Sequence, residues 1–238
     1  MRVLAIETAT LEVGVAVADE SGLLATVTAR PGRRQVETLH PAIADVCRIA
    51  RVTPADLDGV AVDIGPGLFT GLRVGVAAAK ALAAGLGLPV VTATSLEILL
   101  AAIPPGFAVV VPVVDMRRGE VAWLMPGGPT TGTPRVGTPA ELAGELAEAV
   151  PRGTDQPVLL LGDGALRYRE ELAGSVATSL VFAGTELAAP PVGSLAVLAI
   201  SAMKSGSSSD PAAVRPVYGR EADARINWSS RQGRAAVS

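Results

Sequence analysis

Residues 65–75 are the most informative segment of this chain, and they read Gly65-Pro66-Gly67-Leu68-Phe69-Thr70-Gly71-Leu72-Arg73-Val74-Gly75. They follow an apolar run at 60–64 that predicts a strand, and they lead into a helix of small residues at 72–84. Gly65 and Gly67 permit backbone angles that other residues avoid. Thr70 is a candidate N-cap, so the free N–H groups of the helix would point at an anion or a partner.

Hydrophobic periodicity around this segment predicts an α/β first half. Three strands are expected at 3–7, 12–18 and 23–29, and a helix at 35–50. Pro41 inside that helix suggests a kink or a later start, because proline lacks the N–H donor. A strand at 89–92 and a helix at 95–102 follow the glycine-rich segment. We expect a first domain over residues 1–103.

A second α/β half of similar style is expected over residues 104–204, after the break at Pro104-Pro105-Gly106. We expect strands at 107–114, 120–124 and 157–161, a loop at 126–139, and helices at 139–150, 166–173 and 194–204. The last helix is free to pack back on the first half. Residues 205–238 are expected to form a linker, flexible at 205–210, and a tail whose last ten residues are disordered.

Composition narrows the class of protein. The chain has 238 residues, 49% of them hydrophobic and 18% charged, with a net charge of −3, which argues against a free-standing nucleic-acid binder. Cys47 is the only cysteine, so neither an intrachain disulfide nor a thiolate metal cluster is expected. Met1 leads straight into a strand, and the apolar stretch at 72–91 is interrupted by Arg73, Lys80 and Pro89. We therefore expect a soluble cytoplasmic protein without a signal peptide or membrane span.

Several segments together resemble the TsaB (YeaZ) family, and the resemblance covers nearly the whole chain. The matching segments are 65–75, Arg2-Val3-Leu4-Ala5-Ile6-Glu7-Thr8-Ala9-Thr10, Asp115-Met116-Arg117-Arg118-Gly119-Glu120-Val121-Ala122-Trp123, Gly162-Asp163-Gly164-Ala165 and Arg215-Pro216-Val217-Tyr218. The sequence departs from the family at four places. Glu7 replaces Asp, Leu68 replaces a common Ser, Ala122 replaces Tyr, and Gly219-Arg220 replaces Leu-Arg.

The resemblance implies a two-lobed actin-like ATPase (ASKHA) fold, in which each lobe is a mixed sheet with flanking helices. It implies a protein that is not an enzyme by itself. In that family the protein binds and activates its paralogue TsaD, which transfers a threonylcarbamoyl group to the adenosine beside the anticodon of tRNA. TsaE would join this pair, tRNA would be reached only through the complex, and the chain alone would form a homodimer.

The partner surface is expected on the first two helices of the first half, as the resemblance implies. Alanine and glycine occur around the whole circumference of the helix at 72–84, more than one buried stripe needs. We expect the contact with TsaD to involve Leu39, Ile43, Phe69, Leu72, Arg73, Val76 and Lys80. Close packing of the helix on its own sheet is the plainer interpretation for at least one of its faces.

A vestigial nucleotide cleft is the second candidate site. Its residues would be Glu7, Thr8, Thr10, Gly65, Gly67, Asp115, Gly162 and Gly164, with Asp63 facing either way. The plainer interpretation, which we favour, is that the carboxylates cap loops and the glycines permit turns. We expect that this chain requires no cofactor. Whether ATP or ADP binds at the interface of the complex is left open.

A metal site and a nucleophilic centre lack the necessary residues. TsaD has two histidines spaced four apart that hold a metal, whereas His40 is the only histidine here and Gln35 stands where the family often has another. The chain therefore lacks the residues that a peptidase needs, since no second histidine is present to act as a base. The remaining alternative is an independent actin-like ATPase or phosphotransferase.

Overall fold

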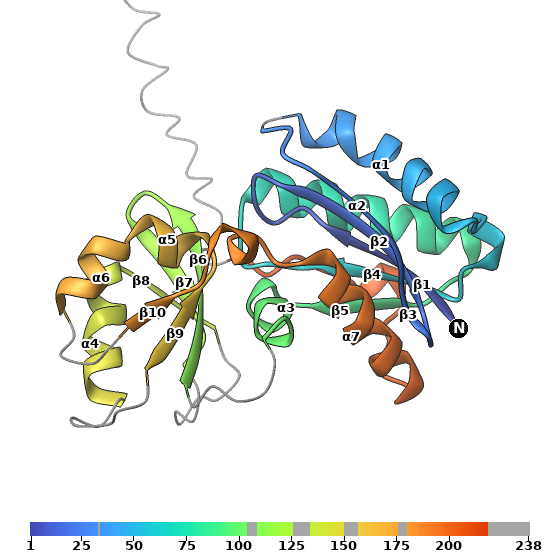
Figure 1. Ribbon diagram of the computed structural model, residues 1–238. Helices are drawn as coiled ribbons and strands as arrows, with labels where there is room; N and C mark the ends of the chain where they lie inside the picture. Colours follow the sequence, from blue (N-terminus) through green and yellow to red (C-terminus); the bar gives the residue numbers. More distant parts are fainter. Residues whose placement is uncertain (33, 104–108, 126–133, 150–156, 176–179, 219–238) are drawn as a thin grey trace, which may run out of the picture.

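The computed structural model describes residues 1–32, 34–103, 109–125, 134–149, 157–175 and 180–218. Several predictions lie outside these ranges, namely the break at 104–106, most of the loop at 126–139, the end of the helix at 150 and the tail from Gly219 on. The described chain forms two five-stranded sheets that lie beside each other, each with helices packed on it (Figure 1). Both sheets contain parallel and antiparallel pairs, so both are mixed.

The first sheet has the order β3-β2-β1-β4-β5. Its strands are β1 (Arg2–Glu7), β2 (Val13–Asp19), β3 (Gly22–Ala29), β4 (Gly59–Asp63) and β5 (Val90–Ala93). Alternate residues of β2 face opposite sides, as a period of two requires. Val13, Val15 and Val17 belong to one core cluster, and Ala16 and Ala18 belong to the other. The central strands are therefore buried on both faces, and helices cover each side (Figure 1).

Helices α1 (Gln35–Ala50) and α2 (Phe69–Leu86) cover one face of this sheet, and α7 (Val192–Lys204) covers the other. The helix α1 begins at its predicted first residue and includes Pro41, so the later start is wrong. The predicted N-cap of α2 is also wrong. The helix is capped at Leu68 without a side-chain hydrogen bond, and Thr70 lies in its first turn. A tertiary contact sets where the helix begins, because the Leu68 N–H donates to the Ala9 carbonyl (2.7 Å) in the loop after β1.

By length and composition alone, α2 could cross a membrane. Its buried stripe, which includes Val76, Ala79 and Ala83, packs instead against the first sheet. The core helix of a folded domain passes the same test. We therefore interpret α2 as a core helix with one exposed side.

The second sheet has the order β10-β9-β6-β7-β8. Its strands are β6 (Val109–Arg117), β7 (Glu120–Trp123), β8 (Arg135–Gly137), β9 (Val158–Leu161) and β10 (Leu180–Phe182), and its helices are α4 (Pro139–Ala149), α5 (Asp163–Arg167) and α6 (Arg169–Ser175). Three predictions are corrected. The described end of the predicted loop contains β8, the helix at 166–173 is two short helices that meet at Tyr168, and β10 had not been expected.

Helix α3 (Ser95–Ala101) lies between the two sheets, where it contacts both β6 and α7. Short 3-10 helices occur at η1 (Pro54–Asp56), η2 (Thr185–Leu187) and η3 (Pro211–Ala213). Within the segment predicted to be a flexible linker, 205–210, Ser209 pairs with Val90 as an extra bridge on the edge strand β5. The chain thus returns to the first sheet after α7.

Candidate functional site

Two acidic residues end neighbouring strands of the first sheet. Glu7 is the last residue of β1 and Asp63 is the last of β4, and these strands are parallel with Ile6 opposite Val62. Both side chains are buried, with 0% and 1% of their surface exposed. The parallel register therefore brings two carboxyl groups to the same buried end of the sheet.

Few donors reach this carboxyl pair. Glu7 Oε1 accepts a hydrogen bond from the Ala9 N–H (2.6 Å), whereas Oε2 has no partner within the part of the chain that the structure describes. Asp63 accepts from the Gly65 N–H (2.7 Å) and from the Ser95 hydroxyl, which lies 2.8 Å from each of its oxygens. Across the described ranges, neither carboxyl group forms an ion pair with an arginine or a lysine, so no cation of this part of the chain neutralises the pair.

Burial therefore decides the protonation of the pair. Burial raises the pKa of Glu7 well above its ordinary value, and the neighbouring charge of Asp63 raises it further. Burial also raises the pKa of Asp63 to about 7, although the hydrogen bonds from Gly65 and Ser95 act in the opposite direction. Two interacting acids in such surroundings do not ionise together. The pair consequently keeps at least one proton in mildly acidic solution.

The glycines of the turn before α2 serve close packing. A Cβ atom on Gly67 would overlap the Ala9 carbonyl oxygen, and one on Gly71 would overlap the Thr8 carbonyl oxygen. The Thr8 hydroxyl in turn donates to the Gly71 carbonyl (2.8 Å), and the Gln35 amide donates to the Thr10 carbonyl (2.6 Å). The loop after β1 therefore lies directly on the start of α2, where the sequence predicted N–H groups that point at an anion or a partner.

The remaining predicted cleft residues gather on the second sheet. The buried Asp115 carboxylate pairs with Arg117 (2.9 Å) and Arg167 (3.4 Å), and the Asp115 N–H donates to Asp163 (2.8 Å). Burial raises the pKa of Asp163 to about 6, against the hydrogen bonds it accepts. Gly162 and Gly164 lie against the backbone of β6, where a Cβ atom on either would collide. The charge of Asp115 is thus already balanced within the chain.

The predicted cleft residues consequently form two groups. Glu7, Thr8, Thr10, Gly65 and Gly67 surround the start of α2, and Asp115, Gly162 and Gly164 surround the end of β6. Over the described residues, no group of three or more His, Cys, Asp or Glu side chains is placed to hold a metal ion. Nucleotide binding to this chain stays a prediction.

A groove between α1 and α2 is the most apolar concavity near the predicted partner surface. It encloses about 570 Å³ and is lined by Val36, Leu39, His40, Phe69, Thr70, Arg73, Val74, Ala77, Ala78 and Ala81. Val36 and Phe69 are 59% and 44% exposed, which is high for large apolar side chains. An apolar hollow with exposed apolar rims is typical of a surface that binds another protein.

The structure separates the seven residues predicted to contact a partner. Leu72 and Val76 are buried and do not line the groove, so their side chains cannot reach a partner. Leu39 is fully buried and contributes only to the lining of the groove. Ile43 is half-buried against the same core. The remaining three residues, Phe69, Arg73 and Lys80, lie at or near the surface.

Sequence analysis missed the part that Tyr218 plays at this surface. Its hydroxyl oxygen lies 3.1 Å from Arg73 Nε, which donates to it, and its ring centre lies 5.0 Å from that of Phe69. The Arg73 guanidinium lies 3.8 Å from the centre of the Phe69 ring. The motif that ends in Tyr218 had been noted, but no periodicity links it to α2. Its aromatic ring in a polar stretch was the only available signal.

Comparisons with known proteins agree with one another. A family model described as "TsaD: tRNA N6-adenosine threonylcarbamoyltransferase" matches residues 23–228. The chain is 26% identical to the tRNA threonylcarbamoyladenosine biosynthesis protein TsaB of Bacillus subtilis, over 98% of this chain and 100% of the relative. It is 32% identical to TsaB of Escherichia coli, over 52% of this chain and 54% of the relative.

The solved structure of YeaZ from Pseudomonas aeruginosa has the same architecture. It superposes with a TM-score of 0.74 at 25% sequence identity, over 91% of this chain and 99% of that chain. Together with the matching family model, this likeness confirms the predicted two-lobed actin-like ATPase fold, each lobe a mixed sheet with flanking helices.

Proposed function

Because the chain belongs to the TsaD family and, within it, to the TsaB (YeaZ) branch, we propose that it is a non-catalytic subunit in the biosynthesis of threonylcarbamoyladenosine in tRNA. It would bind the paralogue TsaD and activate it for transfer of the threonylcarbamoyl group. TsaE would join this pair, and tRNA would be bound by the complex. The proposal puts the protein in the cytoplasm, beside its tRNA substrate.

The apolar groove between α1 and α2 is the observation that carries this proposal. Its exposed Ala77 and half-buried Ala78 would allow a partner helix to approach closely, and Val36 and Phe69 would contribute apolar area at the rim. A second copy of the chain could use the same groove when TsaD is absent, which fits a homodimer.

The two acidic groups support the non-catalytic part of the proposal. The carboxyls of Glu7 and Asp63 retain a proton, and Asp115 is neutralised by Arg117 and Arg167. Ionised, accessible oxygens are what a magnesium–nucleotide complex requires. ATP or ADP would then bind, if at all, with groups of the partner at the interface of the complex.

Reconstitution tests the proposal directly. tRNA modification by TsaD and TsaE is measured without this chain, with the wild type, and with the variants Ala77→Glu and Ala84→Glu. Both alanines are exposed on α2, but only Ala77 lines the groove. We expect modification to require the chain and to be lost with Ala77→Glu but not with Ala84→Glu. Full modification without the chain would remove the proposed function.

The rival function, an independent ATPase or phosphotransferase, is tested with the purified chain alone. ATP turnover is measured for the wild type and for the variants Glu7→Gln and Asp115→Asn. We expect no turnover above the background without protein. Turnover that both variants abolish would favour the rival.

A further inference from the structure

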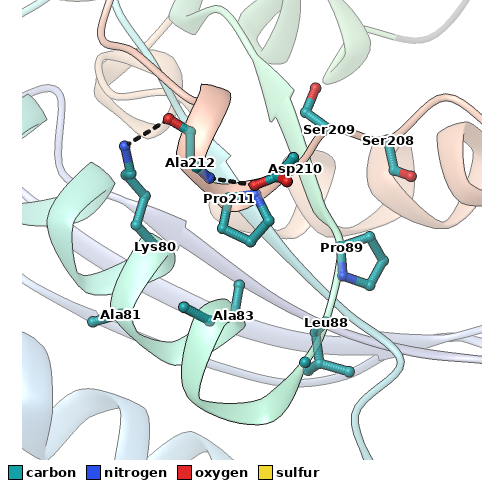
Figure 2. Close-up of a pocket in the computed structure, with 12 residues that line it drawn as sticks. Lys80, Ala81, Ala83, Leu88, Pro89, Ser208, Ser209, Asp210, Pro211 and Ala212 are labelled. Carbon is teal, nitrogen blue, oxygen red and sulfur yellow. Dashed lines mark hydrogen bonds between the residues drawn. The ribbon is translucent and has the colours of Figure 1, made fainter.

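The C-terminal segment, residues 205–218, crosses the first sheet and ends beside the groove. Ser209 forms two backbone hydrogen bonds with Val90 (2.7 and 3.0 Å), which add it to the edge of β5. Figure 2 shows the next part, where the Asp210 carboxylate accepts from the Ala212 N–H (2.6 Å) and Lys80 of α2 donates to the Ala212 carbonyl (3.3 Å). Lys80 also donates to the Val214 carbonyl (3.1 Å). The segment is thus attached to both β5 and α2.

Two further contacts bring the segment to the start of α2. The Val214 side chain is buried in the core that α2 shares with the sheet. The Val217 N–H donates to the Ile64 carbonyl (2.7 Å), and the Val217 carbonyl lies against Gly65, where a Cβ atom would be 2.7 Å away. Tyr218 is therefore delivered to the rim of the groove by a segment that is anchored along its length.

Tyr218 and Phe69 hold the Arg73 side chain. The guanidinium lies over the Phe69 ring, and its Nε–H donates to the Tyr218 hydroxyl. Stacking of this kind restricts the rotamers of an arginine and leaves its terminal N–H groups, which lie in the plane of the guanidinium, available to an acceptor. Across the ranges that the structure describes, no Asp or Glu forms an ion pair with Arg73. A positioned cation with free donors therefore stands at the rim of an apolar groove.

We propose that Arg73, held in place by Phe69 and Tyr218, binds a carboxylate of the protein that docks in the groove. This inference rests on the proposed function, and it specifies the chemistry of the partner: an apolar helix with an Asp or Glu at its edge. The planar guanidinium matches a carboxylate through paired hydrogen bonds. The docking surface then combines α2 with the C-terminal segment, since Arg73 depends on Tyr218 for its position.

A protein carboxylate fits this surface better than a nucleic-acid phosphate. The groove that adjoins Arg73 is lined mostly by Val, Leu, Phe and Ala side chains, which suit apolar side chains of a partner. The ammonium of Lys80, about two turns further along α2, already donates to two carbonyls. Phosphate backbones are bound by several cations acting together, and the whole chain has a net charge of −3.

The test measures the affinity of TsaD for four single variants by titration calorimetry at low and high salt. Arg73→Ala removes the cation. Arg73→Lys keeps the charge but removes the paired guanidinium donors, and Tyr218→Phe keeps the ring but removes the hydroxyl. Arg48→Ala, an exposed arginine at the other end of α1, is the matched control. We expect Arg73→Ala to weaken binding by about tenfold or more, and Arg73→Lys and Tyr218→Phe by about two- to tenfold. The control should bind like the wild type.

The salt dependence provides a second readout, because a charge-assisted contact weakens as salt rises. We expect the wild type to lose more affinity at high salt than Arg73→Ala does. Thermal unfolding of each variant shows that the fold is intact. If Arg73→Ala binds TsaD like the wild type while Ala77→Glu does not, the carboxylate site is wrong and the groove proposal stands. If both variants bind normally, the groove is not the TsaD surface and both proposals fail.

The same variants distinguish TsaD from two other possible ligands of Arg73, namely tRNA and a second copy of the chain. Should Arg73→Ala weaken tRNA binding of the assembled complex but not TsaD affinity, Arg73 contacts a phosphate and the proposal is overturned. Should it weaken only self-association, measured by analytical ultracentrifugation, the occupant is a second copy, and the proposal is likewise overturned.

Discussion

The buried pair of Glu7 and Asp63 makes a prediction about stability that depends on pH. Glu7→Gln replaces one ionisable group by an amide of the same shape. The amide oxygen can still accept from the Ala9 N–H, and the amide is uncharged, as a protonated Glu7 is. We therefore expect position 7 of the variant to stay neutral at every pH, while Asp63 still titrates.

The sign follows from proton linkage. The pKa of Glu7 is raised well above its ordinary value of 4.5 on folding, so the folded chain binds a proton at Glu7 more tightly than the unfolded chain does. The stability due to that proton is fully present below about pH 4.5 and is lost as the pH rises through the folded pKa of Glu7. Each pKa unit corresponds to about 1.4 kcal/mol of the free energy of unfolding, and Glu7→Gln removes this loss.

Urea unfolding followed by circular dichroism at pH 4.5, 6, 7 and 8 measures the effect. We expect Glu7→Gln to match the wild type at pH 4.5 and to exceed its free energy of unfolding by about 1–3 kcal/mol at pH 8. The exposed Glu148→Gln is the matched control and should follow the wild type throughout. Parallel profiles of Glu7→Gln and the wild type over the whole range would refute a proton held by Glu7.

Three further predictions concern packing and charge. Gly71→Ala should lower the free energy of unfolding by about 1–3 kcal/mol, because its Cβ would overlap the Thr8 carbonyl, whereas Gly85→Ala on the same helix meets open space and should gain up to about 1 kcal/mol in urea unfolding. Val214→Ala should cost about 1–3 kcal/mol and make residues 205–218 more sensitive to limited proteolysis, which wild-type rates would contradict. Asp163→Asn should flatten the decline of stability between about pH 4 and 6, as thermal unfolding at both pH values would show, because the pKa of Asp163 is raised to about 6.

Much of the first sheet could be predicted, because its elements are long enough to show their periodicity. The alternation at Val13, Val15 and Val17 gave β2, and a clear apolar stripe gave α1 its observed bounds. The errors lie where tertiary contacts override local signals. The strands β8 and β10 have three residues each, too few for a pattern, and no glycine or proline marks the break at Tyr168.

The candidate site divides in the same way. The sequence was enough to group Glu7 with Gly65 and Gly67 in one candidate cleft, but the protonation of Glu7 depends on burial, which the sequence does not display. Asp63 is bonded to Ser95, a residue 32 positions away. The contact of Arg73 with Tyr218 spans 145 positions, and neither local propensity nor periodicity can pair such residues.

The path of the chain between the sheets has a consequence for how the two lobes change. The chain leaves the first sheet through α3 and returns to it through α7, and these two helices contact each other. In the topology of the chain, the second lobe is therefore an insertion between α3 and α7, and its two ends lie close together. The length of that insertion can therefore change without altering the strand order of the first sheet, whereas its removal would expose Leu96 and Leu99 of α3, which pack against the second lobe.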